Sequence, residues 1–141
     1  MKPPRVVTSA ALAAFALAGV GASSGLAGSH ERAKTRVAVT LNEWKVIPAM
    51  RSAPAGVVTF TVKNRGSIKH EFLVIRSSRP PNALRTKGAE ASEAGLTKGT
   101  AEFKPGLTTA LTVTLKKGTY VLICNIPGHY KAGQYAAFTV K

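Results

Sequence analysis

Residues Cys124 to Gln134 read C-N-I-P-G-H-Y-K-A-G-Q, and this stretch decides how the C-terminal part of the chain folds. A strand-like run, Thr119 to Cys124, leads into it, and a second run, Tyr135 to Lys141, follows it. Pro127 and Gly128 favour a turn between the two runs. The stretch therefore predicts two strands joined by a loop, and the loop carries a thiol, an imidazole and an amide.

The spacing of these polar side chains is typical of a metal site. Four residues separate Cys124 from His129, and four more separate His129 from Gln134. A second imidazole, His70, lies upstream in N-R-G-S-I-K-H-E-F. One thiolate with two imidazoles is a trigonal donor set suited to copper, and a weak axial ligand completes an electron-transfer site. The sequence therefore predicts one copper ion per chain, with His70, Cys124, His129 and Gln134 as ligands.

This arrangement resembles that of the cupredoxin, or type 1 blue copper, family. A His followed by Phe on a strand, and then Cys-x4-His-x4-ligand near the C-terminus, is the family pattern, and it covers most of the chain after the N-terminal leader. Met is the commonest fourth ligand in that family, and Gln134 resembles the stellacyanin branch of the plant phytocyanins. Those proteins also have a disulfide, which a chain with one cysteine cannot form. The scaffold therefore looks more like a small bacterial cupredoxin.

The resemblance implies an all-β, single-domain fold, a Greek-key β-sandwich or barrel. It also implies that the protein carries single electrons between redox partners, through His129 as the ligand nearest the surface, and is not an enzyme. In the resembling family an Asn often follows the first His. Here that residue is Glu71, and Asn125 is a candidate to supply the missing hydrogen bond. The alternative function is copper binding or delivery without redox turnover, although delivery sites are more often rich in Met or His.

The rest of the chain also favours an all-β fold. Short apolar and β-branched runs, several with period-two alternation, are separated by polar turns. The expected strands are Thr35–Leu41, Val57–Asn64, His70–Arg76, Leu107–Leu115, Thr119–Cys124 and Tyr135–Lys141. Ser77 to Thr100 lacks this pattern, and we interpret it as a long inserted loop with a short helical turn around Glu90 to Ala94. Many short strands with polar turns predict a sandwich or barrel.

The N-terminus has the features of an export signal. Lys2 and Arg5 form a positive region, Val6 to Val20 is almost wholly apolar, and small residues follow from Gly21 to Ser29. Such a pattern predicts a cleaved signal peptide, and the apolar run is short for a membrane span of ~20 residues. We therefore expect an exported protein that is periplasmic, secreted or at the cell surface. An uncleaved membrane anchor is the alternative.

Cleavage near Ala27 divides the chain into a signal peptide over 1–27, a tail over 28–34 and the copper domain over 35–141. If the cut falls after Ala27, the new terminus reads Gly28-Ser29-His30. A free amine, two amides and an imidazole in that order can wrap Cu(II) or Ni(II) in a square plane. His30 is otherwise a residue of the terminal tail.

Other interpretations of the thiol and imidazoles stay open at this point. Cys124 could be a buried core cysteine, and a Cys/His set also suits zinc, although Gln is a rare zinc ligand. A Cys–His hydrolase would need an Asp or Asn to orient the base, and none is evident. Trp44 is interpreted as a core or edge aromatic rather than an electron relay.

The charge of the chain is strongly positive. The whole sequence carries a formal charge of +14, residues 28–141 carry +12, and every acidic residue is a Glu. Such a field favours partners with acidic docking surfaces. Nucleic acid is not expected, because no recognition motif accompanies the charge and export removes the usual target. We expect a monomer that contacts a membrane only if the N-terminal segment is retained.

Overall fold

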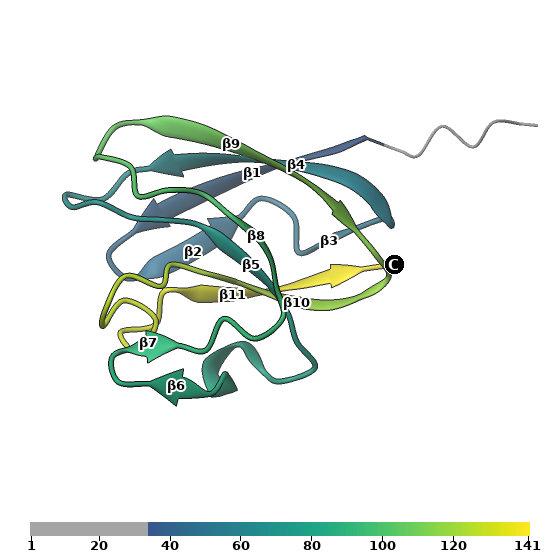
Figure 1. The fold of residues 1–141 in the computed structure, drawn as a ribbon. Helices are drawn as coiled ribbons and strands as arrows, with labels where there is room; N and C mark the ends of the chain where they lie inside the picture. The colour runs from purple at the N-terminus through teal and green to yellow at the C-terminus, as the bar shows by residue number, and fades with distance from the viewer. Residues whose placement is uncertain (1–33) are drawn as a thin grey trace, which may run out of the picture.

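The protein is described by a computed structural model, which gives residues 34–141 (Figure 1). The predicted signal peptide over 1–27, the tail up to residue 33 and His30 lie outside these residues. The strands are β1 (Thr35–Asn42), β2 (Lys45–Pro48), β3 (Ser52–Ala53), β4 (Gly56–Asn64), β5 (Leu73–Arg76), β6 (Thr86–Lys87), β7 (Glu90–Ala91), β8 (Leu96–Gly99), β9 (Thr108–Leu115), β10 (Gly118–Ile123) and β11 (Tyr135–Val140). One 3-10 turn, η1 (Pro81–Ala83), interrupts them, and none of residues 34–141 forms an α-helix.

Two sheets face each other across the core. The first has the strand order β2-β1-β4-β9, the second has the order β3-β11-β10-β5-β8, and β6 with β7 forms a separate hairpin. Most neighbours are antiparallel, whereas β1 with β4 and β3 with β11 are parallel. The chain crosses between the sheets after β2, β3, β4, β8 and β9. This arrangement confirms the predicted all-β Greek-key sandwich.

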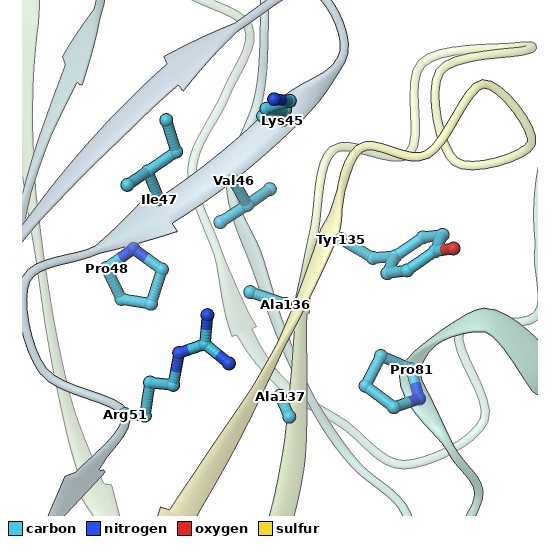
Figure 2. A pocket seen from close by; sticks show the side chains of 9 residues that line it. All are labelled: Lys45, Val46, Ile47, Pro48, Arg51, Pro81, Tyr135, Ala136 and Ala137. Atoms are coloured by element: carbon cyan, nitrogen blue, oxygen red, sulfur yellow. The ribbon is translucent and has the colours of Figure 1, made fainter.

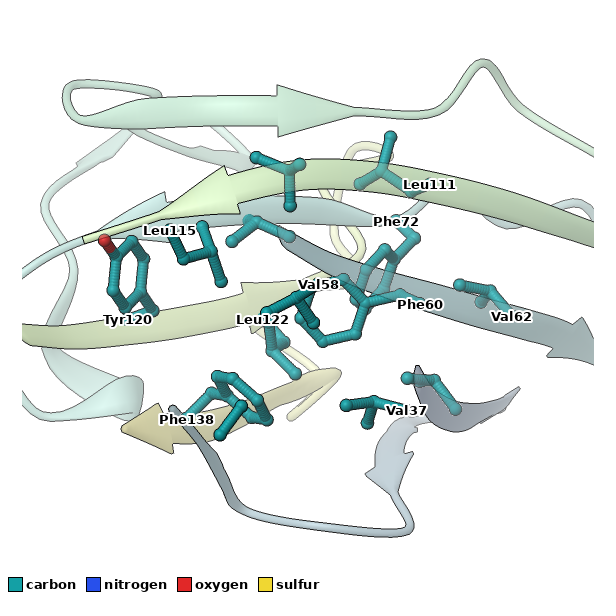
Figure 3. Packing of buried hydrophobic residues seen from close by; sticks show 14 of the residues in the cluster. Val37, Val58, Phe60, Val62, Phe72, Leu111, Leu115, Tyr120, Leu122 and Phe138 are labelled. Carbon is teal, nitrogen blue, oxygen red and sulfur yellow. The ribbon is translucent and has the colours of Figure 1, made fainter. Parts of the chain in front are cut away.

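The inward faces of the strands fill the space between the sheets with apolar side chains (Figure 3). Along β4 the burial alternates, so that Val58, Phe60 and Val62 point inward, as period-two sequences do. The Phe60 ring lies 5.3 Å from that of Phe72 and 5.4 Å from that of Phe138, measured between ring centroids. These aromatic contacts join the two sheets, because Phe72 and Phe138 belong to the opposite side of the sandwich.

Strands β5 and β10 are apolar on both faces, and the segment 77–100 explains why. Their outward-facing residues Leu73, Ile75, Val121 and Ile123 form a second buried cluster with Leu84, Ala91 and Tyr130. Leu84 and Ala91 come from the inserted segment, which covers this face of the second sheet. A continuous apolar run is expected for a strand that is buried on both sides.

The expected helical turn at Glu90 to Ala94 is wrong, because Glu90 and Ala91 form β7 and pair with Thr86 and Lys87. The sequence also did not predict β2, β3, β6 or β8. These strands have two to four residues, and their pairing partners rather than their own composition hold them in place. In the region that the structure describes, no helix is long and apolar enough to cross a membrane.

Candidate metal centre

Neighbouring strands of the second sheet bring the predicted ligands to one end of the sandwich. Cys124 directly follows β10, and Gln134 directly precedes β11. Ile123 of β10 pairs with Tyr135 of β11 on one side and with Leu73 of β5 on the other. The strand register therefore places all these strand ends at the same edge of the sheet.

His70 reaches this edge just before β5 begins. It lies outside the named strands, contrary to the predicted strand from 70 to 76, and forms an isolated antiparallel bridge with Phe103. Its N–H donates to the Phe103 carbonyl at 3.2 Å, and the Phe103 N–H donates back at 2.8 Å. This bridge fixes the backbone that carries the first imidazole.

A series of turns returns His129 to the vicinity of Cys124. The His129 N–H donates to the Ile126 carbonyl at 2.9 Å, and the Gln134 N–H donates to the His129 carbonyl at 3.1 Å. Gly128 has a φ of 87°, which glycine adopts without the steric cost that a side chain brings. The predicted Pro-Gly turn is therefore the element that directs the second imidazole inward.

The four polar side chains converge in a buried cluster. The ligand atoms of His70, Cys124 and His129 lie within 4.8 Å of one another. The Cys124 Sγ lies 3.3 Å from the His129 Nδ1 and 3.8 Å from the His70 Nδ1, and the two Nδ1 atoms are 3.3 Å apart. Both imidazoles therefore present the same ring nitrogen to the thiol.

Gln134 points into the cluster and not to solvent. Its side chain is fully buried, and its Oε1 lies 3.1 Å from the His129 Nδ1. Its Nε2 donates to the Asn42 carbonyl at 2.9 Å and lies 3.1 Å from the His70 Nδ1. Because the nitrogen is held by Asn42, the amide oxygen is the Gln134 atom that can bind a metal.

The electrostatic environment keeps the imidazoles neutral. Burial lowers the pKa of His70, although its hydrogen bond to the Glu43 carboxylate and the charge of that carboxylate oppose the effect. Burial and the neighbouring His70 lower the pKa of His129, which is 6% exposed. Neutral imidazoles have a lone pair available for a metal. Both rings are therefore in the protonation state that metal binding needs.

The thiol is held in an apolar and hydrogen-bonded setting. Burial raises the pKa of Cys124 to about 11, although the backbone N–H groups of Glu71 and Ile126 oppose this shift. The Glu71 N–H lies 3.4 Å from the Sγ. A thiol must lose its proton when a metal binds, and these two N–H groups stabilise the resulting thiolate.

Asn125 does not supply the compensating hydrogen bond to the ligands that the sequence suggested for it. Its Oδ1 accepts from the Ala91 N–H at 2.7 Å, and its Nδ2 donates to the Ala91 carbonyl at 3.0 Å. Tyr130 makes similar contacts, since its hydroxyl accepts from the Leu84 N–H and donates to the Pro81 carbonyl. These bonds attach the inserted segment to the loop that carries His129.

Two residues that sequence reasoning did not place in the site contact the imidazoles. The Glu43 Oε1 lies 3.1 Å from the His70 Nε2, and the Trp44 ring packs edge-on against the His129 ring with centroids 4.8 Å apart. Glu43 and Trp44 lie in the turn between β1 and β2. No sequence pattern links that turn to the site, because the contacts depend on how the first sheet packs on the second.

The donor set fits copper. It combines one soft thiolate sulfur with two imidazole nitrogens, and the weaker amide oxygen lies beside them; this is the combination found in type 1 copper sites. The four side chains form a buried group. Burial also raises the pKa of Cys124, whereas a nucleophilic thiol needs a lowered one. The arrangement favours a metal centre over a hydrolase.

A hollow of about 390 Å³ lies elsewhere, between β2 and the beginning of β11 (Figure 2). Its walls include Val46, Ile47, Pro81 and Ala136, with the side chains of Lys45 and Arg51 at its margin. None of the four predicted ligands lines it. The hollow is therefore separate from the candidate metal centre.

Comparisons with known proteins agree with this geometry. Residues 46–141 match the model of the sulfocyanin (SoxE) domain. The chain is 34% identical over 84 residues to the copper-resistant cuproprotein CopI of Vibrio cholerae. The aligned stretch covers 57% of this chain and 48% of that protein. The chain thus spans about half the length of this curated relative.

Solved structures with the same fold include auracyanin and the copper protein rusticyanin. The reduced auracyanin of Roseiflexus castenholzii is 21% identical, with a TM-score of 0.57 and coverage of 77% of this chain and 96% of that one. Rusticyanin of Thiobacillus ferrooxidans is 20% identical, with a TM-score of 0.58 and coverage of 77% of both chains. At this level of identity the likeness concerns the fold, and it confirms the resemblance to the cupredoxins.

Proposed function

The chain belongs to the sulfocyanin (SoxE) domain family, and from this premise we propose that it is a mononuclear copper protein that carries single electrons between redox partners. His70, Cys124 and His129 would hold the metal, with the Gln134 oxygen as the axial donor. The convergence of an Sγ and two Nδ1 atoms within 4.8 Å, all buried, carries the proposal. It is a binding function rather than an enzymatic one.

Bound copper supplies a Cu(II)/Cu(I) couple, which takes one electron from a donor and gives one electron to an acceptor. The residues of the chain supply a site that needs little rearrangement. The backbone bridge at His70, the turns around His129 and the Asn42 carbonyl at Gln134 hold these three donors in position through bonds within the protein. Donors that are already oriented lose little conformational freedom when the metal binds.

The surface around the site favours acidic partners. Exposed cations adjoin the residues that build the site: Lys45 follows Trp44, Lys69 precedes His70, and Lys131 lies in the loop after His129. Trp44 and Ile68 add exposed apolar surface nearby, at 40% and 41%. An apolar patch with a positive rim suits brief docking to a negatively charged protein.

The proposal places the protein outside the cytoplasm, as the predicted signal peptide over 1–27 implies. There it would act as a monomer, with no contact to nucleic acid and with membrane contact only if the N-terminal segment is retained. Fractionation of the cells that produce it tests the location. Sedimentation of the copper-loaded protein tests the monomeric state.

The absorption and electron paramagnetic resonance spectra of the copper-loaded protein test the metal site. We expect an intense visible thiolate-to-copper band that disappears on reduction and returns on oxidation. A copper complex without that band contradicts the type 1 assignment. A protein that binds zinc and not copper in competition contradicts the choice of metal.

Salt dependence tests the docking surface. Reduction by the anionic reagent ferrocyanide should slow as ionic strength rises, because screening removes the attraction to the positive surface. Oxidation by the cationic tris-phenanthroline complex of cobalt should respond in the opposite direction. Lys131→Gln should weaken the dependence of both rates on ionic strength. Rates independent of salt with both reagents would leave the charge without a role in docking.

The match to the copper-resistant cuproprotein CopI favours a second candidate, copper binding or delivery without redox turnover. The two functions differ in whether the metal stays. An electron carrier should exchange electrons rapidly with both cobalt and iron complexes and retain its copper. A delivery protein should lose Cu(I) quickly to a soft chelator such as bathocuproine and exchange electrons slowly.

A further inference from the structure

We propose that the turn Asn42–Trp44, which consists of the last residue of β1 and the two residues before β2, orients the three donors of the metal centre other than the thiol. The inference rests on the proposed function, since it concerns the same copper site. Each residue of the turn contacts a different donor: Asn42 contacts Gln134, Glu43 contacts His70, and Trp44 contacts His129.

Glu43 fixes the orientation of the His70 ring. Its carboxylate lies 3.1 Å from the His70 Nε2 and also accepts from the Ser67 N–H at 2.9 Å and the Ile68 N–H at 3.2 Å. These bonds hold the carboxylate in place and keep its pKa below the usual range despite burial. A carboxylate acceptor places the imidazole proton on Nε2 and leaves Nδ1 free for a metal.

The absence of a side chain at position 66 makes this contact possible. A Cβ at Gly66 would lie 2.7 Å from the His70 Nε2 and would collide with the Glu43 carboxylate. The glycine therefore lets the backbone approach the hydrogen-bonded His70 and Glu43 side chains closely. Gly66 therefore leaves the room that the Glu43 carboxylate occupies beside His70.

Trp44 covers the ring of His129. Residue Trp44 is 40% exposed whereas residue His129 is 6% exposed, and the two rings pack at 70° to each other. Most of the surface that a partner or a chelator meets here therefore belongs to Trp44. A covering aromatic ring limits access of water, and solvent access controls both metal retention and potential.

Asn42 completes the set through its backbone. Its carbonyl accepts from the Gln134 Nε2 and so leaves the Oε1, which lies 3.1 Å from the His129 Nδ1, as the amide atom available to a metal. The match to the sulfocyanin domain begins at residue 46, so the turn lies outside the matched residues. The matched region thus contains the four donors, while the residues that orient three of them come from the preceding strand connection.

Substitutions in the turn test the inference on copper-loaded protein. Glu43→Ala should speed the loss of copper to a chelator by about 10–100-fold, the usual cost of removing a partner of a metal ligand. Glu43→Gln keeps an acceptor but loses the charge, so it should retain copper better than Glu43→Ala and raise the reduction potential. Trp44→Ala should speed copper loss, and Trp44→Phe should restore most of the wild-type rate.

Matched controls separate this role from general effects of charge and apolar surface. Glu102→Gln removes an exposed carboxylate that lies 4.0 Å from Lys69 and makes no bond to a donor, and it should leave copper loss within twofold of wild type. Leu107→Ala removes an exposed apolar side chain, and it should also leave the rate of copper loss within twofold of wild type. Copper loss and potential unchanged in Glu43→Ala and Trp44→Ala would overturn the inference.

A measurement without metal distinguishes failure of this inference from failure of the proposed function. Nitrogen NMR of the copper-free protein should show His70 protonated on Nε2 with slow exchange of that proton, and Glu43→Ala should lose the protected signal. If copper-loaded wild type lacks the thiolate band, the proposed function fails, whereas the NMR result still supports the role of Glu43. A protected His70 signal that persists in Glu43→Ala overturns that role.

Discussion

The space between the two sheets and the end that carries His70, Cys124 and His129 are both buried, but they are built from different chemistry. The first contains aliphatic and aromatic side chains only, contributed by alternating positions of long strands. The second contains the buried polar residues Asn64, His70, Asn125, His129 and Gln134 beside the buried thiol. Apolar packing is non-directional, whereas most buried polar groups have a hydrogen-bond partner; in the described residues the Asn42 Oδ1 is an exception.

This difference teaches why the site end needs so many specific contacts. Gln134 bonds Asn42, Asn125 bonds Ala91, and Asn64 bonds the carbonyls of Ile68 and Phe103. A partner that is lost at this end leaves a buried polar atom unpaired, whereas neighbouring side chains in the core can partly fill a lost contact. The two regions should therefore respond differently to substitution.

The largest contrast is expected from Cys124→Ser. A hydroxyl cannot replace a soft thiolate donor, so the visible band should be lost completely while the circular dichroism of the sandwich stays unchanged. His70→Ala and His129→Ala should weaken copper binding or open a coordination position. A Cys124→Ser protein with the wild-type visible spectrum would remove the thiol from the proposed site.

A substitution in the core should have the opposite effect and lower stability without changing the copper spectrum. Phe60 is fully buried between Phe72 and Phe138, and Phe60→Ala should lower the free energy of unfolding by about 3–5 kcal/mol. The visible band of the folded fraction should keep its position. Thr61→Ala, an exposed position on the same strand, is the control and should change stability by less than about 0.5 kcal/mol. A shifted band in Phe60→Ala would show that the two regions are coupled.

Asn125 tests the connection between the site and the inserted segment. Asn125→Ala leaves the Ala91 N–H and carbonyl without their partner, which should cost about 1–3 kcal/mol of unfolding free energy. Hydrogen exchange should become faster in the segment 86–91, and the visible band should persist. Ser92→Ala, which removes an exposed hydroxyl bonded to Ala94, is the control. Equal stability of Asn125→Ala and wild type contradicts the anchoring role.

The smallest expected effect is at the axial position. An amide oxygen is a harder donor than a thioether and favours Cu(II), so Gln134→Met should raise the reduction potential while a type 1 spectrum remains. A tenfold change in preference between the two copper states corresponds to about 59 mV. Gln134→Leu should raise the potential further. Potentials of wild type and Gln134→Met that agree within error would mean that Gln134 does not act on the metal.

The strand predictions succeeded where a strand has a pattern of its own. β1, β4, β9, β10 and β11 were predicted to within one or two residues because their apolar residues alternate or run continuously. The segment 77–100 was interpreted as a long loop and contains no long strand, but its short strands β6, β7 and β8 were not predicted. Two to four residues hold no periodicity, so their strand conformation depends on the partner that they meet.

For the site, the spacing in C-N-I-P-G-H-Y-K-A-G-Q indicated three of the residues that converge, because a short loop between adjacent strands keeps them close. His70 was proposed from its residue type and from the family resemblance, and the pairing of β5 with β10 explains its position. Asn125 was suggested as a source of a compensating hydrogen bond because it directly follows Cys124. The Asn125 side chain instead points toward the inserted segment, where it bonds Ala91.

By itself the sequence determined the long strands and the spacing of Cys124, His129 and Gln134, because alternation and short-range spacing are local properties that the chain carries wherever it folds. Only the tertiary structure decided that the turn Asn42–Trp44 lies against the donors, since that contact needs the first sheet to pack on the second. It also decided that Gln134 presents its oxygen and that Trp44 covers His129. Contacts between distant segments depend on packing, and no local pattern encodes them.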